Sequence, residues 1–583
     1  MEIGSRNSPS AEEAHLSPSE SNSKKPGGWK AIKYILGNES FEKLASMSLV
    51  ANITVYLRTK YNLSGIILVN VVTIWSGTSN ISTIGGAIIS DVYLGRFLTL
   101  LLGTICTLLG MAAMTLTATI SELRPPFCQE DSICAQPHKW QLAFLFSALG
   151  LIAIGAGGIR PCNIAFGADQ FDTNTEKGRA QLESFFNWWY FSFTIALVIA
   201  LTGVIYVQTN ISWIIGFAIP TACLVTSITI FLIGRNTYIY RKPQGTVFVD
   251  MARVAMAAYR KRKINLKSGN EHCYYDPAEE VDHLQDRKLI RINRFKYLDK
   301  AAVIIDPNEL DPQGFPVDKW RLCSVQQVEK LKCLLKIVPV WVAGIGCFVV
   351  MDQQSTFGVL QAIQMNRSIN SDFKIPPGWM GITSMLALSI WILLYEQIYI
   401  PKARKILKRD SRLTMQQRIF IGIVLSILCM IVAGTVERKR RSMALKEGSY
   451  ASPLHVAVLL PQFILSGLTE AFAAVGLMEF FTIQLPESMR SVAGSIFFLS
   501  LSVASYLSSL IVNIMHSVTG QGGEKPWLGG HDLNVNKLDN YYYIIAGLGV
   551  INLMYFTFFA RKYVPFGEDV KEGGEVQMNT SRV

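Results

Sequence analysis

Three charged side chains lie within one helical turn of the first long apolar stretch of the chain. Glu39, Glu42 and Lys43 belong to the sequence Gly-Asn-Glu-Ser-Phe-Glu-Lys, which apolar residues flank on both sides. Charges inside a membrane-spanning helix are costly, so they normally face a protein interior or a wet cavity. On a helix Glu39 and Glu42 share a face, and Lys43 lies four residues beyond Glu39, where the two can pair. One interpretation is a charge-neutralised kink or a turn at the water boundary, but three charges in one turn favour proton or substrate chemistry.

The composition is that of a membrane protein. Half of the 583 residues are hydrophobic and only 17% are charged, whereas an ordinary soluble domain has about 25% charged residues. The net charge of +12 does not require a nucleic-acid partner, because membrane proteins concentrate Lys and Arg in cytoplasmic loops. The ten cysteines show no metal-binding spacing. Only Cys128 and Cys134, in a polar loop, are placed to form a disulfide, provided that the loop faces outside.

Twelve apolar stretches are long enough to span a bilayer. A polar region separates the first six from the last six, which is the layout of two parallel six-helix halves. We therefore expect a cytosolic disordered tail over 1–29, helical bundles over 30–235 and 332–562, a cytosolic linker over 236–331 and a second disordered tail over 563–583. The stretches lie near residues 31–57, 66–94, 97–120, 140–161, 185–207, 211–234, 333–352, 376–400, 417–436, 453–484, 489–515 and 541–560.

Basic residues set the expected orientation. Arg260–Lys263 in the linker and the Lys- and Arg-rich loop after span eight place these segments in the cytosol, together with both termini. One segment conflicts with this topology, because the basic run Arg438–Arg441 follows span nine and would lie outside. In the linker, apolar residues at helical spacing predict an amphipathic helix along the membrane face that braces the two halves. These residues are Phe248, Met251, Val254, Ala255 and Tyr259.

The segment Gly85–Thr99 joins spans two and three. Its glycines permit a tight turn, and Asp91 and Arg96 can pair across the junction. The segment resembles the major-facilitator loop motif, in which such charges latch one conformation. Thr99 matches the position at which phosphorylation by a kinase switches affinity in a nitrate carrier, although a threonine that caps or packs at a helix start is the commoner explanation.

The segment Gly157–Asp172 closes span four. Its glycine pair and Pro161 loosen the helix where Arg160 enters, and a buried Arg needs a partner or an anion. This run resembles the signature of the proton-dependent oligopeptide transporters, which in plants form the nitrate/peptide transporter family. The resemblance covers most of the chain and excludes only the tails and parts of the linker. It is carried further by Phe185–Tyr190, Pro339–Trp341, Gly467–Phe472 and Pro486–Ser491.

The resemblance gives the charged residues of span one a counterpart, the Glu-x-x-Glu-Arg proton-coupling motif, which ends here in Lys43. Lys keeps the charge but lacks the planar fork of Arg, so proton coupling through Glu39 and Glu42 is implied and peptide transport is not. The branch with glucosinolate and low-affinity nitrate transporters has the same departure. Met351 occupies the position of the histidine that binds nitrate in the dual-affinity carrier of the family, and a thioether supplies neither a proton nor a positive charge. Asp352 is either a second protonatable site or a solvated acid at a helix mouth.

We therefore expect an all-α membrane protein with the major-facilitator fold, twelve transmembrane helices in two halves, and proton-coupled symport by alternating access. A proton on Glu39 or Glu42 would weaken the pair to Lys43 and allow the halves to rock. Arg160 and Glu470 would attract one another across the cavity and favour a closed cytoplasmic side, until an anionic substrate competes for Arg160.

Met351, Ser355 and nearby aromatic residues predict a roomier and more apolar pocket than nitrate needs. The expected substrate is a glycosylated or anionic plant metabolite, such as a glucosinolate-like glucoside or a hormone, with nitrate as the alternative. A passive anion channel or efflux facilitator is an alternative of another class, and no metal triad, phosphate loop or nucleophile elbow favours an enzyme. We expect no cofactor besides the proton gradient, a monomer or weak homo-oligomer surrounded by lipid, and location in the plasma membrane or, alternatively, the vacuolar membrane.

Overall fold

The computed structural model describes most of the chain between residues 27 and 564. The predicted disulfide between Cys128 and Cys134 lies outside the described residues, as do nearly all of the two predicted tails. The described ranges are 27–126, 135–171, 175–240, 247–263, 274–277, 289, 291, 294–370, 373–407, 413–486, 489–521 and 525–564.

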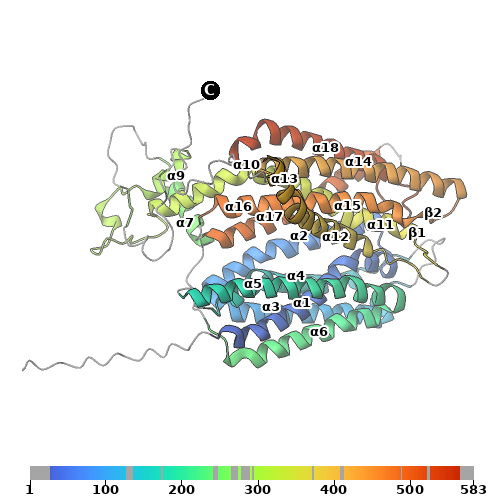
Figure 1. The fold of residues 1–583 in the computed structure, drawn as a ribbon, viewed down its shortest axis with the longest axis horizontal. Coiled ribbons are helices and arrows are strands. Elements are labelled where there is room, and N and C mark those ends of the chain that lie inside the picture. Colours follow the sequence, from blue (N-terminus) through green and yellow to red (C-terminus); the bar gives the residue numbers. More distant parts are fainter. Residues whose placement is uncertain are drawn as a thin grey trace, which may run out of the picture.

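The first half of the chain forms one layer of long helices, drawn in blue to green in Figure 1. The first helix begins slightly before the predicted boundary at residue 30, and the fourth continues through Pro161 beyond the predicted end of its span. Interior proline is tolerated in membrane helices because neighbouring groups satisfy the freed carbonyl. The helices are α1 (Gly28–Lys60), α2 (Gly65–Ile89), α3 (Gly95–Thr119), α4 (Lys139–Ala168), α5 (Glu176–Ile199) and α6 (Trp213–Ile233).

The chain reverses direction between α2 and α3. Gly95 adopts φ 76° after a π-helical turn over Ser90–Leu94, a conformation that residues other than glycine rarely adopt. Both helices pack on α4 through small residues: a side chain at Gly86 of α2 would collide with the backbone of Gly157, and one at Gly103 of α3 with that of Gly155. The close approach holds one face of α4 against its neighbours and leaves another face for the interior of the molecule.

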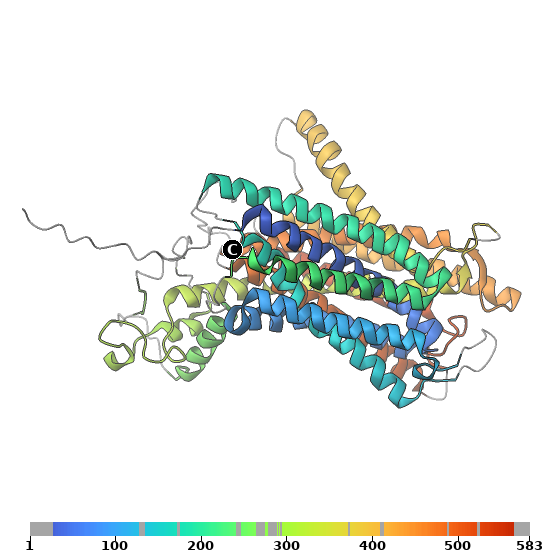
Figure 2. The ribbon, with the colours of Figure 1, turned by 90° about the horizontal axis from the view of Figure 1, so that it is seen from below.

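The second half forms the other layer, drawn in yellow to red in Figure 1. In Figure 2 its helices α12 and α13 project from the bundle. Ser324 caps α10 in a reciprocal arrangement with Gln327, so this helix begins at Val325, earlier than the predicted bundle boundary. The helices are α10 (Val325–Gln353), α11 (Val359–Ile363), α12 (Trp379–Leu394), α13 (Ile400–Leu407), α14 (Met415–Glu447), α15 (Leu460–Thr469), α16 (Val475–Gln484), α17 (Arg490–Thr519) and α18 (Leu538–Phe558).

The described helices account for the twelve predicted membrane spans. Within the described part of the chain, ten helical segments are long and apolar enough to cross a bilayer, and one of them, Gly65–Thr119, contains both α2 and α3. α1 is also long enough to cross a bilayer, but its charged residues make it too polar to be counted among these segments. Counting α2 and α3 separately and adding α1 gives twelve. A small parallel strand pair, β1 (Met365–Asn366) and β2 (Ser452–His455), is an addition to the predicted all-α architecture.

The described part of the linker lies at one end of the molecule, against α10 of the second half (Figure 1). A helix, α7 (Val247–Arg260), lies where the sequence predicted an amphipathic one, but not all of its predicted apolar residues are covered. Met251 and Val254 are buried, whereas Ala255 and Tyr259 are exposed. α7 packs against α10 and the short helix α9 (Lys296–Asp299). These neighbours cover one side of α7 and leave the other side exposed.

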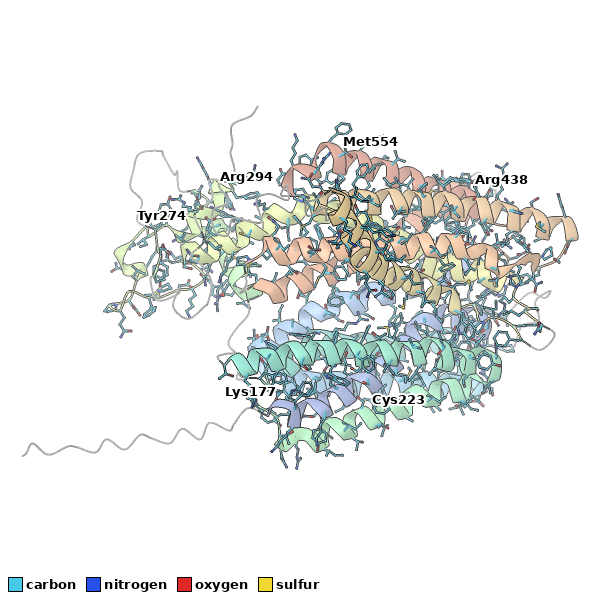
Figure 3. The ribbon with its side chains drawn as sticks, in the orientation of Figure 1. Lys177, Cys223, Tyr274, Arg294, Arg438 and Met554 are labelled. Carbon is cyan, nitrogen blue, oxygen red and sulfur yellow. The ribbon has the colours of Figure 1, made fainter. Side chains whose placement is uncertain are left out.

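The basic run Arg438–Arg441 lies at the end of the molecule opposite the linker. Figure 3 labels Arg438 at this end, and Tyr274 and Arg294 of the linker at the other. The run is not a loop, as the sequence suggested, but the last part of α14. Arg440 is completely buried and binds both carboxylate oxygens of Glu437 at 2.8 Å. Glu437, just before the run, therefore neutralises one of its charges, which weakens the conflict with the predicted topology.

Candidate functional site

The two halves touch at the end away from the linker. Thr54 of α1 donates to the carbonyl of Ser355 at 3.3 Å, and Ser502 of α17 donates to the carbonyl of Gly77 in α2 at 2.8 Å. Further out, Asn70 of α2 accepts a hydrogen bond from Ser509 of α17 at 2.7 Å. These contacts close one end of the interface between the layers, which we call the closed end.

Loops of the second half cover Arg58 at the closed end. The guanidinium of this buried residue donates to the hydroxyl of Tyr450 at 3.2 Å, and the Tyr450 ring stacks on His531 at 6.3 Å between centroids. Burial, together with the charge of Arg58, lowers the pKa of His531 to about 4, although the Asp532 carboxylate opposes this shift. Acidification therefore disfavours this arrangement.

Towards the linker, α2 and α17 enclose a cavity of about 1470 Å³ instead of touching. The later part of α2 contributes Asn80 and Thr83 to its wall, and the earlier part of α17 contributes Ser495 and Phe498. Linker residues such as Phe315 line the mouth of this central cavity. The structure is therefore open towards the linker and sealed at the opposite end, as one state of an alternating-access cycle requires.

The charged residues of α1 form a compact group at this cavity, here called the α1 cluster (Glu39, Glu42 and Lys43). Lys43 Nζ lies 3.3 Å from Glu42 Oε2 and 3.7 Å from Glu39 Oε1. Ser46 donates to Glu42, whereas neither carboxylate oxygen of Glu39 has a hydrogen-bond partner among the described residues. Glu39 and Lys43 line the cavity. Two carboxylates thus share one ammonium group, and a second positive charge must come from outside the cluster to match both of them.

Arg160 faces the same cavity from α4. Its Nη1 donates to Asn80 Oδ1 at 2.6 Å, and its guanidinium lies 5.8 Å from the ring centroid of Phe498. It is also close enough to Glu42 for their charges to interact. Because Phe498 belongs to α17, this cation–π contact links the two halves at the cavity. Sequence reasoning missed both partners of Arg160; the available signal for Asn80 was an amide side chain inside the apolar span 66–94.

The predicted site residues of the second half lie apart from Arg160. Glu470 has no ion pair in the described part of the chain and does not line the central cavity. Met351 packs against the main core. Asp352 lies beside Ser505 of α17, and one of its carboxylate oxygens has no partner among the residues that the structure describes. Ser355 belongs to the closed end. Their roles in binding or gating, including an attraction between Arg160 and Glu470 when the linker side closes, stay predictions.

The turn between α2 and α3 carries an ion network at the cavity mouth. Arg96 lies 3.9 Å from Asp91 and 2.5 Å from Asp169 at the end of α4. The predicted pair is therefore extended by a third charge that ties the turn to α4. Thr99 is buried and donates to the carbonyl of Gly95 at 2.9 Å, a packing arrangement that leaves its hydroxyl inaccessible to a kinase in this conformation.

Comparison with known proteins identifies the family. Residues 97–528 match the sequence profile of the POT family. The chain is 57% identical over 544 residues to the Protein NRT1/PTR FAMILY 2.8 of Arabidopsis thaliana, covering 93% of this chain and 96% of that protein. It is 45% identical over 572 residues to the Arabidopsis thaliana Protein NRT1/PTR FAMILY 2.13, covering 96% and 92%.

The fold agrees with this relationship. The crystal structure of the POT family transporter PepTSo superposes with a TM-score of 0.67 at 17% identity, covering 94% of this chain and 99% of that one. The motif resemblance and the major-facilitator fold inferred from the sequence are thus confirmed. The chain belongs to the POT family of proton-coupled membrane transporters, within its NRT1/PTR branch, and is not an enzyme.

Proposed function

We propose that this protein is a symporter that carries an organic anion, such as a glycosylated metabolite or an acidic hormone, together with protons. The observation that carries the proposal is the position of the α1 cluster beside Arg160 at one wall of the central cavity. An ionisable residue inside a transmembrane helix is by default a candidate for a functional role. Location in the plasma membrane with both termini cytosolic is part of the same proposal.

Charge balance supplies the coupling. With both carboxylates ionised, the negative charges of Glu39 and Glu42 are matched by Lys43 and Arg160. A proton on one glutamate leaves one positive charge in excess, and an anion at Arg160 restores neutrality. Proton binding and anion binding therefore strengthen one another, and this linkage is reciprocal. Carrying either ligand alone would require an uncompensated charge in a low-dielectric site.

The cavity wall favours an anion larger than nitrate. Pockets for drug-sized ligands usually measure about 300–1,000 Å³, and the central cavity at about 1470 Å³ reaches beyond that range. Aromatic rings of Trp189, Phe193 and Phe498 contribute to its wall. Cations outnumber acids in the lining, with Lys43, Arg96, Arg160, Arg253, Lys319 and Lys330 against Glu39, Asp91 and Asp250.

Nitrate transport is the second candidate, because Arg160 is sufficient to attract any small anion. Met351 argues against nitrate, because it replaces the histidine that binds nitrate in the dual-affinity carrier of the family. Met351 also packs in the core and does not line the central cavity. A passive channel would not need two buried acids that share one cation, so the α1 cluster also weighs against that class.

Uptake into oocytes at external pH 5.5 and 7.5 tests the proposal. The panel comprises a glucoside, a glucuronide, an acidic hormone and nitrate. We expect acid-stimulated, saturable uptake of an organic anion that exceeds nitrate uptake, and its loss in a Glu39→Gln/Glu42→Gln double variant with normal surface expression. Saturable nitrate uptake with no organic substrate in the panel would contradict the substrate class, and pH-independent uptake would contradict symport.

A further inference from the structure

A buried amide in the wall of the central cavity has no hydrogen-bond partner in the described ranges of the chain. Asn163 lies one helical turn beyond Arg160 on α4, so the two side chains share a face of the helix. Both line the central cavity. Asn163 is only 3% exposed, and neither its Nδ2 nor its Oδ1 has a partner among the described residues. An amide offers two donors and one acceptor group, and buried polar groups are rarely left unsatisfied.

A second donor without a partner among the described residues lines the same cavity, on α5. The indole N–H of Trp189 is buried and has no acceptor in the described part of the chain. The Trp189 ring stacks on Phe193 with 5.8 Å between centroids and 12° between planes, and both rings line the cavity. Trp189 and Phe193 thus give the cavity a flat apolar surface with one donor, and the amide and the guanidinium of α4 line the same cavity.

The chemistry of these groups fits a sugar ring. The C–H face of a sugar is flat and apolar enough to pack on an aromatic ring, while its hydroxyls both donate and accept hydrogen bonds. The carboxamide of Asn163 suits sugar hydroxyls, because it too both donates and accepts hydrogen bonds. Nitrate, or a purely aromatic acid, would satisfy Arg160 but would leave the donors of Asn163 and Trp189 unused.

We propose that Asn163 and Trp189 form a sugar-binding subsite in the central cavity, and that Arg160 binds the anionic group of the same substrate. This inference rests on the proposed function, because it assumes that the substrate passes through the central cavity. It goes further by naming glycosylated anions as the substrate class and two residues as determinants of that specificity. A site built to hydrogen-bond hydroxyls discriminates strongly against ligands that lack them, because its polar groups are then left unpaired.

Two probes with a common fluorophore isolate the sugar. 4-Methylumbelliferyl β-D-glucuronide and 4-methylumbelliferyl sulfate each carry one negative charge at pH 5.5, but only the first has a sugar ring. Binding of each to the purified full-length protein in lipid nanodiscs is measured by fluorescence polarisation. We expect wild-type protein to bind the glucuronide roughly tenfold more tightly than the sulfate, as two net hydrogen bonds imply.

Asn163→Leu removes the hydrogen-bonding groups at nearly constant volume, and Trp189→Phe removes the N–H but keeps an aromatic ring. Asn163→Leu should weaken glucuronide binding about tenfold and Trp189→Phe by a smaller factor, while sulfate binding stays within about twofold in both. Thr83→Val is the matched control, because Thr83 lines the same cavity but its hydroxyl already donates to the carbonyl of Asn80 at 2.7 Å. It should bind both probes like wild type.

Equal affinity of the wild-type protein for the two probes would overturn the subsite, as would unchanged glucuronide binding in Asn163→Leu. Parallel loss of both probes in Asn163→Leu would also overturn it, because the residue would then support the fold rather than the sugar. Failure of the proposed function would give a different result, namely no pH-driven anion uptake by the wild-type protein. Such uptake depends on the α1 cluster whichever anion is carried, and not on the sugar-binding subsite.

Discussion

Neutralising Glu42 should uncouple substrate binding from the proton. At effective dielectric constants of about 20, the separations of 3.3 and 3.7 Å from Lys43 correspond to gross attractions of about 5 kcal/mol for Glu42 and about 4.5 kcal/mol for Glu39. The two acids are therefore close to equivalent, and Lys43 keeps one strong partner when either is removed. Glu42→Gln has the same shape as the native side chain and can still bond Ser46, so the fold should be retained.

The variant changes the charge balance permanently. With Gln at position 42, Lys43 and Arg160 exceed the single carboxylate of Glu39 by one positive charge at every pH. An anion then needs no proton for a neutral site. In the wild-type protein, one linked proton gives up to a tenfold change in apparent KM per pH unit above the pKa of the site, so the apparent KM should rise at least severalfold between pH 5.5 and 7.5. In Glu42→Gln we expect less than about a twofold change over this range.

The assay is uptake of the best organic anion at several external pH values, normalised to surface protein. Glu447→Gln is the matched control, because Glu447 is an exposed acid at the end of α14, remote from the cavity, and it should keep the wild-type pH dependence. A wild-type slope in Glu42→Gln, with unchanged expression, would refute the assignment and move the proton site to Asp352 or Glu470.

Three further predictions concern other parts of the transport path. Asn80→Leu removes the hydrogen bond that holds Arg160 and should raise the KM for anions roughly tenfold or more without affecting a neutral glucoside; equal effects on both would contradict a role through the Arg160 charge. Met351→His should raise nitrate uptake if the second half contributes to the site in another conformation, measured with labelled nitrate, and no gain would argue that residue 351 never meets the substrate. The lowered pKa of His531 implies that the closed end is stable above pH 6.5, the ordinary His pKa, and is weakened by up to about 1 kcal/mol as pH falls to about 5. Labelling of a cysteine introduced at that end should increase over this range in wild type but not in His531→Asn, and a pH-independent wild type would contradict the prediction.

Much of the fold could be predicted from the sequence because its signals are local. Apolar stretches of sufficient length revealed the spans, and the charges of Glu39, Glu42 and Lys43 stood out against their apolar surroundings. Helix ends were less predictable, since Ser324 caps α10 so that it begins at Val325, and α14 continues to Glu447, where Gly448 ends it in a left-handed conformation. Such effects depend on a few hydrogen bonds rather than on hydropathy.

Partners across the molecule could not be predicted in the same way. Arg160 was recognised as a buried charge, but the helices that supply Asn80 and Phe498 are brought to it only by packing. The unpartnered amide of Asn163 is likewise invisible in a sequence, because an unused hydrogen bond is a property of the surroundings. Glu470 was expected near Arg160, yet any pairing of these two residues must belong to another conformation.

Concentrative uptake in proteoliposomes tests the central claim most directly. Purified protein is reconstituted with equal internal and external concentrations of the glucuronide probe, and the external pH is lowered by two units with no other gradient. Symport of one proton with each anion predicts internal accumulation of up to about 100-fold, since each tenfold ratio corresponds to about 1.4 kcal/mol, and collapse of the gradient by a protonophore should abolish it. Flux that only equilibrates the probe, with no accumulation under the pH gradient, would contradict the account and identify the protein as a passive facilitator.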